Sequence, residues 1–277
     1  MPQIVKATTR HGPFYCVASD EFIALSLIAY GEFSQSELDI FSQIIFPGMT
    51  VVEVGANIGA HTVPMARLCA PGTLHAFEPQ QLVYQLLCAN LVVNDIDNVL
   101  AYSEACGAGE TIGAMRRLTD SDATNPGSES VRPLEEIETD PALKARSHRV
   151  RITPLDHLYL DRCDLLKIDV EGMEADVISG ARETITRCRP IIYTENDRLG
   201  RQAGVIGAID VLGYRQYWHM AKMHNPNNFK GSPNLFGDLI SLNMLCIPSE
   251  RDMQVGDLIL IDPAHPTAPE GIDYPSQ

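Results

Sequence analysis

Short apolar runs alternate with helix-like stretches along most of this chain, and this alternation constrains the fold more than any other feature. Several of the runs show no polar alternation, as expected of strands that are covered on both faces. We predict strands over 50–55, 73–79, 99–105, 164–170, 190–195, 214–220 and 241–247, and helices over 60–69, 80–93, 174–186 and 204–212. Such alternation predicts a doubly wound α/β sheet that is mostly parallel, with helices on both faces.

Three regions lie outside this core, so we expect one domain over 46–248 with an extension on each side. Residues 1–45 contain the apolar segment EFIALSLIAYGEF and a predicted helix from Ser36, which Ser34 or Ser36 would cap. Residues 107–150 are polar and charged, and we expect an insertion that forms an excursion from the core or a partly mobile loop. Residues 249–277 form a tail. The segment HNPNNFKGSPN between the last two strands predicts a long loop.

Charge and composition exclude several classes of function. The 277 residues carry a formal net charge of −15, which disfavours a surface for nucleic acid. No apolar run reaches the roughly 18 residues of a membrane span, and the N-terminus lacks the apolar core of a secretory signal. The 7 cysteines are scattered without a CxxC pair, which indicates reduced thiols. We therefore expect a cytoplasmic protein that binds neither nucleic acid nor membrane.

The stretch VVEVGANIGAHT, residues 51–62, joins a predicted strand to a helix through a glycine turn. Gly55 and Gly59 allow positive φ and a close approach of the backbone to a ligand, and the helix start presents free N–H groups. The stretch has neither the Gly-Lys-Ser/Thr of a Walker A loop nor the spacing of GxGxxG. Glu53 would repel a phosphate but would attract the sulfonium and ammonium groups of S-adenosylmethionine. In the alternative interpretation, Glu53 forms a cap or a salt bridge.

Glu78 ends the next predicted strand, in LHAFEP. It follows the glycine turn by about 20 residues, where nucleoside-binding folds place an acid that accepts both ribose hydroxyls. The alternative is a solvated acid at a strand end. Together, Glu53 and Glu78 favour nucleoside binding. Pro64 would remove a hydrogen bond early in the following helix, so we expect that helix to be kinked or to start late.

Two further strand ends carry charged and polar groups. Lys167 and Asp169 are two residues apart in DLLKIDVEG and so share one face of their strand, and Glu171 continues the same parity. A lysine inside a central strand needs a partner, either Asp169 or an acid on the neighbouring strand. These residues form a structural ion pair in one interpretation and face the reactive end of a cofactor in the other. Glu195 and Asn196 end the next strand along the chain.

Glu195 and Asn196, at the end of the strand over 190–195, have two possible roles. Asp169, Glu195 and Asn196 could hold a divalent cation such as Mg²⁺ through oxygen ligands. Alternatively, Glu195 acts without a metal, as a general base or as a hydrogen-bond partner of a substrate hydroxyl. We favour the metal-free interpretation.

The blocks VVEVGANIGAHT, FEP, LLKIDVEGMEADVISGA, PIIYTE and SLNMLCIP resemble the FkbM family of S-adenosylmethionine-dependent methyltransferases. The resemblance implies a class I, Rossmann-like methyltransferase fold with a seven-stranded sheet whose last strand is antiparallel. It also implies O-methylation of a sugar or natural-product hydroxyl. The residues implied at the cofactor are Glu53, Gly55, Asn57, Gly59, Thr62, Glu78, Pro79, Ala105 and Asp169. Those implied at the reaction centre are Lys167, Asp169, Glu171 and Glu195. Asn196 departs from the family pattern and resembles the acid–Asn metal pair of catechol-type methyltransferases.

A hydroxyl is a weak nucleophile, so its methylation gains from a general base. The candidates are Glu195, Asp169 and His219, and His219 could instead serve only in packing. We expect a small hydroxylated acceptor, in a pocket built from residues 1–45, 107–150 and the Asn-rich loop. The alternatives are N-methylation, methylation of an RNA ribose, cyclisation, an NAD-type oxidoreductase or a non-catalytic binding protein. The segment EFIALSLIAYGEF could form a homodimer contact.

Overall fold

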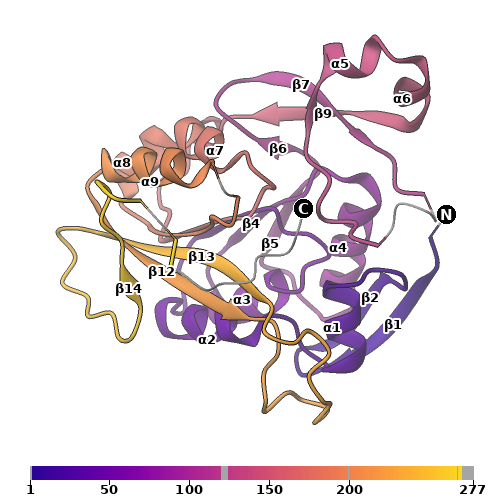
Figure 1. The fold of residues 1–277 in the computed structure, drawn as a ribbon, viewed down its shortest axis with the longest axis horizontal. Coiled ribbons are helices and arrows are strands. Elements are labelled where there is room, and N and C mark those ends of the chain that lie inside the picture. Colours follow the sequence, from indigo (N-terminus) through magenta and orange to yellow (C-terminus); the bar gives the residue numbers. More distant parts are fainter. Residues whose placement is uncertain (1, 120–123, 199, 267, 270–277) are drawn as a thin grey trace.

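A mixed, mostly parallel sheet forms the centre of the molecule (Figure 1). The computed structural model describes residues 2–119, 124–198, 200–266 and 268–269. Within these residues the main sheet has the strand order β14-β12-β13-β11-β10-β3-β4-β5. Its strands are β3 Val51–Val54, β4 Leu74–Phe77, β5 Val99–Tyr102, β10 Leu165–Ile168, β11 Ile191–Glu195, β12 Tyr214–Lys222, β13 Ile240–Pro248 and β14 Ile259–Leu260.

The strand directions confirm the expected class I methyltransferase sheet. β5, β4, β3, β10 and β11 are parallel to one another, whereas β13 is antiparallel to both β11 and β12. The predicted strands are all present in the described chain, and the two-residue strand β14 adds to them. The largest difference in a strand boundary is that the strand expected over 99–105 ends at Tyr102, and Ala105 belongs to a second, smaller sheet.

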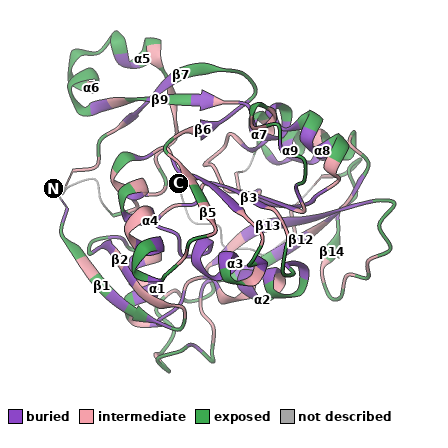
Figure 2. Cartoon of the chain, turned by 180° about the vertical axis from the view of Figure 1, so that it is seen from behind, coloured by how far each residue is buried: buried purple, intermediate pink, exposed green. Residues whose placement is uncertain are grey.

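Helices cover both faces of the main sheet, as predicted. The helices on one face are α2 Gln35–Ile44, α3 Thr62–Cys69 and α4 Gln81–Val93, and on the other α7 Glu174–Gly180, α8 Arg182–Cys188 and α9 Gln202–Asp210. Val51 packs into the core on the α2–α4 side, while its neighbour Val52 packs into the core on the α7–α9 side. This alternation is the period of a strand with two covered faces, and the central strands are accordingly buried throughout (Figure 2).

Three helices differ from the predicted bounds by two residues or more, and one of them, α9, spans Gln202–Asp210 rather than 204–212. α3 begins at Thr62 rather than at residue 60, which confirms the late start expected from Pro64. Pro64 lies in the first turn of α3, where a residue without an N–H group is tolerated. The helix expected over 174–186 is two helices, α7 and α8, which meet at Ala181.

The N-terminal region forms a hairpin and a helix beside the sheet. β1 Ile4–Thr9 pairs antiparallel with β2 Gly12–Val17, and α1 Ile23–Ala29 follows. Asn90 of α4 fastens this hairpin, because its side chain accepts the N–H of Tyr15 at 2.7 Å and donates to the carbonyl of Tyr15 at 3.0 Å. Among the described residues, none of the helices has the length and apolar character that crossing a membrane requires.

The insertion after β5 is more regular than the loop that we expected over 107–150. In the described residues it contains a four-stranded sheet of β6 Ala105–Cys106, β9 Ser147–Thr153, β7 Thr111–Arg116 and β8 Arg132–Pro133, in that order. The short helices α5 Leu134–Glu138 and α6 Pro141–Arg146 lie between β8 and β9, and the 3₁₀ turn η1 Leu155–Leu158 leads back to β10. Most of the described part of this segment is therefore regular structure rather than a loop.

The segment between β12 and β13, residues 223–239, is a long loop, as predicted. It packs against α1 and the residues that follow it (Figure 1). Lys230 donates to the carbonyl of Ile28 at 2.6 Å, and Ser232 donates to the carbonyl of Ala29 at 2.6 Å. The loop thereby satisfies carbonyl groups at the C-terminal end of α1 that lack a partner within the helix.

Candidate active site

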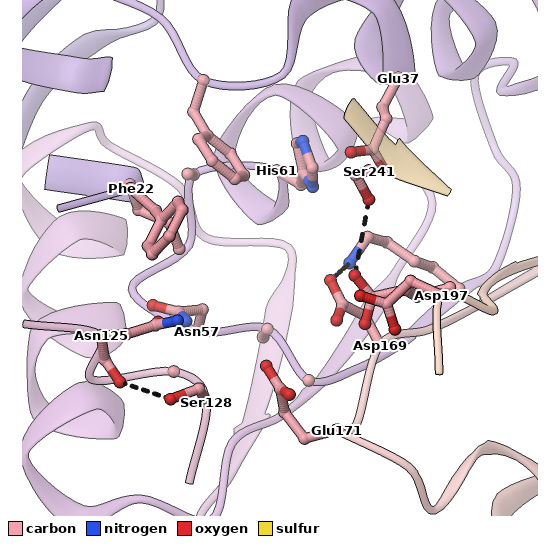
Figure 3. A pocket seen from close by; sticks show the side chains of 18 of the residues that line it. Phe22, Glu37, Asn57, His61, Asn125, Ser128, Asp169, Glu171, Asp197 and Ser241 are labelled. Atoms are coloured by element: carbon pink, nitrogen blue, oxygen red, sulfur yellow. Dashed lines mark hydrogen bonds and ion pairs between the residues drawn. The ribbon is translucent and has the colours of Figure 1, made fainter. Parts of the chain in front are cut away.

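The ends of neighbouring strands meet at one edge of the main sheet and enclose a cavity of about 510 Å³ (Figure 3). Its lining residues include, in the order of the strands, Glu78 after β4, Gly55 after β3, Asp169 after β10, Glu195 at the end of β11 and Ser241 in β13. Neighbouring strands are about 4.8 Å apart, so these positions follow one another along the edge. The volume suits a ligand of the size of a nucleoside together with a small second molecule.

The glycine turn after β3 packs directly against the end of β10. Gly55 has φ +87°, and a Cβ atom there would lie 1.7 Å from the carbonyl oxygen of Asp169, so a side chain cannot be accommodated. The N–H groups of Gly55 and Ala56 both donate to the carbonyl of Phe77, at 3.0 and 2.9 Å. Asn57 also has positive φ, at 49°. The turn is thus fixed by backbone contacts and lines the cavity with main-chain atoms.

Glu78 is held in place by the main chain around it. One carboxylate oxygen accepts the N–H of Asn57 at 3.0 Å, and the other accepts the N–H of Gln80 at 2.8 Å. Burial raises the pKa of Glu78 to about 7, despite these two hydrogen bonds. A smaller cavity adjoins the first beyond Glu78, and its lining includes Pro79 and Ala105. Glu78 therefore stands where the two cavities meet, with a fixed orientation.

Lys167 is a buried lysine near the edge of the sheet that pairs with two carboxylates. Its side chain is 2% exposed, and its ammonium lies 3.3 Å from Asp169 and 3.5 Å from Glu53, whose side chain is 1% exposed. Burial alone would lower the pKa of Lys167, but the carboxylates around it outweigh burial and raise that pKa. Glu53 also accepts a hydrogen bond of 2.6 Å from the hydroxyl of Thr62. Lys167 is therefore an ammonium ion that fixes both carboxylates.

Further carboxyl groups line the cavity beyond Asp169. Burial raises the pKa of Glu37, from α2, to about 7. The pKa of Glu171 is also raised to about 7, by burial and then by Asp169, even though Arg198 forms an ion pair with it. The pKa of Glu195 lies well above its ordinary value because of burial and then the charges of nearby acids. Several of these groups consequently change their protonation near neutral pH.

Comparison with known proteins agrees with this geometry. The family model described as the methyltransferase FkbM domain matches residues 53–230, which is more than half of the chain. The chain belongs to the FkbM methyltransferase family. The resemblance inferred from the sequence is thus confirmed, and residues 53–230 are a methyltransferase domain of this family.

Relatives of this FkbM methyltransferase match parts of it. Methyltransferase sdnD of Sordaria araneosa is 29% identical over 158 residues, which cover 48% of this chain and 60% of that protein. AMB antimetabolite synthetase AmbE of Pseudomonas aeruginosa is 27% identical over 203 residues, 61% of this chain and 9% of that protein. A solved methyltransferase FkbM from Methylobacillus flagellatus aligns with a TM-score of 0.46 and 14% identity, over 74% of this chain and 47% of that one. The chain spans less than two thirds of the length of each.

The residues of the FkbM methyltransferase fit the expected cofactor. Glu53, Gly55, Asn57, Glu78 and Asp169 line the large cavity. Pro79 and Ala105 line the small one, and both were predicted to bind the cofactor. The fixed carboxylate of Glu78 suits ribose hydroxyls, and the turn at Gly55 leaves room for a ligand against the backbone. When bound, S-adenosylmethionine supplies a methyl group that is activated by its positive sulfur.

Gly59 and Thr62 were also predicted at the cofactor, but neither is among the residues that line the two cavities. Gly59 has φ +88°, and Leu87 packs where its Cβ atom would be. Thr62 does not line the cavity, but its hydroxyl donates a hydrogen bond to Glu53, which does. Both residues support the turn in this structure.

The structure does not assemble the predicted metal set of the FkbM enzyme. Asn196 directly follows Glu195, and consecutive residues at a strand end point to opposite faces. The Asn196 amide accordingly donates to the carbonyl of Gln202 and to the sulfur of Met244, away from Asp169. Within the described ranges, no cluster of three or more His, Cys, Asp and Glu side chains is arranged to hold a metal ion.

His219, a predicted general base, lies outside both cavities. Its Nδ1 atom is 2.7 Å from the hydroxyl of Tyr193, and the strand β13 separates β12 from β11. Burial lowers the pKa of His219 to about 4. The position corresponds to the packing role that we considered for this residue.

Sequence reasoning missed several residues that line the cavity of the FkbM methyltransferase. The most informative are Glu37, His61, Asp197 and Ser241 (Figure 3). His61 follows the glycine turn and packs between Phe33 and Phe41. The position of His61 directly after the glycine turn was the sequence signal that could have identified it. Glu37 lies on α2, and no pattern in the sequence indicates where that helix docks.

Proposed function

We propose that this FkbM enzyme transfers the methyl group of S-adenosylmethionine to a hydroxyl oxygen of a small molecule, a sugar or another natural product. The proposal depends chiefly on the neighbouring carboxylates Asp169 and Glu195. Ile168 and Thr194 are partners in the register of β10 and β11, so Asp169 and Glu195 follow at adjacent positions. Both line the cavity, where a carboxylate can hold a hydroxyl and accept its proton.

The reaction requires that the acceptor hydroxyl is correctly positioned beside the methyl group and that a nearby group accepts its proton. The acceptor oxygen forms a bond to the methyl carbon while the carbon–sulfur bond breaks, and the electron pair of that bond stays on sulfur. The hydroxyl proton passes to Asp169 or Glu195. The pKa of Glu195 is raised by burial and then by Asp169 and Asp197, so its ionised form is a stronger base than an ordinary carboxylate. Holding the oxygen in line with the methyl group supplies much of the rate.

The size and charge of the site support a small acceptor. A cavity of about 510 Å³ has room for one small molecule beside the cofactor. The carboxylates Glu37, Glu195 and Asp197 would repel the phosphates of a nucleic acid, and the whole chain carries −15. We therefore favour a sugar or natural-product hydroxyl over an RNA ribose.

The test is product analysis with the purified enzyme. S-adenosylmethionine with an isotopically labelled methyl group is incubated with a panel of glycosides and hydroxylated polyketides, and NMR locates the label in the product. We expect an O-methyl ether, and we expect Glu195→Gln to lower kcat by about 100-fold or more. The matched control is Glu183→Gln, because Glu183 is exposed on α8. A label on nitrogen or carbon, or unchanged turnover in Glu195→Gln, would contradict the proposal.

A further inference from the structure

The strand order divides the cavity into two parts. Glu78 and the turn at Gly55 form the part that fits the nucleoside, as described above. Asp169 lies next along the edge, and Glu195 and Ser241 lie beyond it. We call the part formed by Glu37, His61, Glu195, Asp197 and Ser241 the acceptor half. A molecule that receives the methyl group must lie in this half, because the cofactor occupies the other.

The acceptor half has more acidic side chains than cationic ones. The cavity lining in the described residues contains two cationic side chains, Lys167 and Arg198. Lys167 is engaged by Glu53 and Asp169, and Arg198 forms an ion pair with Glu171.

Three carboxyl groups remain in the acceptor half, those of Glu37, Glu195 and Asp197. Across the described part of the chain, no ion pair joins any of them to a lysine or arginine. The hydroxyl of Ser34 donates to Glu37 at 2.6 Å, and that of Ser241 donates to Glu195 at 3.5 Å, so the partners of these two acids are neutral. The cofactor has a net charge of +1, from its sulfonium, ammonium and carboxylate groups, so it cannot balance these three acids when they ionise in the neighbouring half. A group that is charged and unpaired in such a site is costly.

His61 gives an independent indication of a ligand in the same half. It is 5% exposed, it lines the cavity, and its Nε2 atom has no hydrogen-bond partner among the described residues. Burial, and then the charge of Lys167, lowers the pKa of His61 well below its ordinary value, so the ring is neutral. A neutral imidazole adds a hydrogen-bonding nitrogen and no positive charge. Figure 3 shows the ring among the side chains that surround the cavity, with Glu37 and Ser241.

We propose that the acceptor is a cationic molecule, an amino sugar or an amino alcohol, whose ammonium group binds Glu195 and Asp197. The inference depends on the proposed function, because it concerns the molecule whose hydroxyl is methylated. An ammonium carries three donors and one charge, so it satisfies two carboxylates and leaves a donor for a neutral partner. A divalent cation is a weaker candidate, since the described side chains offer no set of three His, Cys, Asp or Glu ligands.

The test compares three probes that differ at one nitrogen. D-glucosamine, N-acetyl-D-glucosamine and D-glucose are titrated by calorimetry or ligand-observed NMR into the protein loaded with S-adenosylhomocysteine, at pH 7 and with EDTA. We expect glucosamine to bind at least tenfold more tightly than the other two. Glu195→Gln and Asp197→Asn should each reduce this preference by threefold or more. Glu183→Gln, on the exposed surface of α8, should leave it unchanged.

Each outcome decides the inference. Equal affinity for the three probes, or no binding of glucosamine, overturns it, and so does a preference that appears only when Mg²⁺ replaces EDTA. Unchanged affinity for S-adenosylhomocysteine in both variants verifies that the fold and the nucleoside half are intact. Methyl transfer to the nitrogen of glucosamine would overturn the O-methylation proposal while retaining the cationic acceptor. O-methylation confined to neutral sugars would overturn the cationic acceptor while retaining the O-methylation proposal.

Discussion

Replacement of Lys167 by methionine tests how the edge of the sheet is held together. The change removes a buried charge and leaves a side chain of similar length, so packing is largely kept. Of its two partners, Asp169 is 39% exposed and can be solvated by water, whereas Glu53 is 1% exposed and cannot. The cost therefore arises mainly from Glu53, and breaking such a buried pair destabilises a protein by about 3–5 kcal/mol. We expect Lys167→Met to lower the free energy of unfolding by this amount at pH 8.

The loss should depend on pH in a direction that follows from Glu53. Without Lys167, the folded-state pKa of Glu53 rises further above its value of about 4.3 in the unfolded chain. The native state then binds more protons than the unfolded state above that pH. The free energy of unfolding of the variant, relative to wild type, should thus fall as pH rises above about 4.3, by up to 1.4 kcal/mol per pH unit. Urea unfolding followed by circular dichroism between pH 5 and 8 measures this slope.

Two further variants complete the experiment. Lys144→Met removes an exposed lysine of α6 and should change the free energy of unfolding by less than about 0.5 kcal/mol. Lys167→Met combined with Glu53→Gln should recover most of the loss, because the buried charge is then absent. If Lys167→Met is within about 1 kcal/mol of wild type at pH 8, or shows no pH dependence, the reasoning about this ion pair is refuted.

Three other predictions concern single residues. Gly55→Ala should destabilise the fold by about 3 kcal/mol or more, because the new Cβ would lie 1.7 Å from a carbonyl oxygen and the residue has φ +87°. Gly204→Ala in α9 is the control, since its Cβ would have no neighbour within 4 Å. Equal thermal midpoints of the two variants would contradict this prediction. Glu78→Ala should weaken binding of S-adenosylhomocysteine at least tenfold in calorimetry, and wild-type affinity should decline as pH falls below about 7, where Glu78 becomes protonated. His219→Gln should keep kcat within about tenfold of wild type, since His219 lies outside the cavity; a loss of about 100-fold would make it a general base.

The main sheet could be predicted because its strands are covered on both faces. VVEV in β3 and LLKI in β10 are nearly continuous apolar runs, which is the pattern of a central parallel strand. The strands of the insertion were not predicted, because they are exposed on one face. In β9, Val150 and Ile152 are buried while Arg149 and Arg151 are exposed, so the sequence SHRVRIT alternates as a strand does. The number of charged residues obscured that alternation.

The site could be predicted where it depends on strand ends, and not where it depends on docking. Parity within a strand and the common edge of parallel strands locate Asp169 and Glu195 without a structure. The same parity argues against Asn196 as a partner of Glu195, and applying it would have removed the metal set. Glu37 and His61 reach the cavity from α2 and from the start of α3. Their positions follow from helix packing, which no local pattern specifies.

The contact between the β12–β13 loop and α1 has a consequence for redesign of the enzyme. Both segments contribute wall residues to the cavity, Phe22 and Ile23 before and at the start of α1 and Leu239 at the end of the loop. Because Lys230 and Ser232 bind the carbonyls at the end of α1, each segment stabilises the other. A library that randomises the loop alone would also destabilise α1. A change of activity in such a variant could then come either from a different acceptor preference or from the loss of ordered structure in α1. The two segments, about 200 residues apart in the chain, therefore constitute one exchangeable cassette and should be transplanted together.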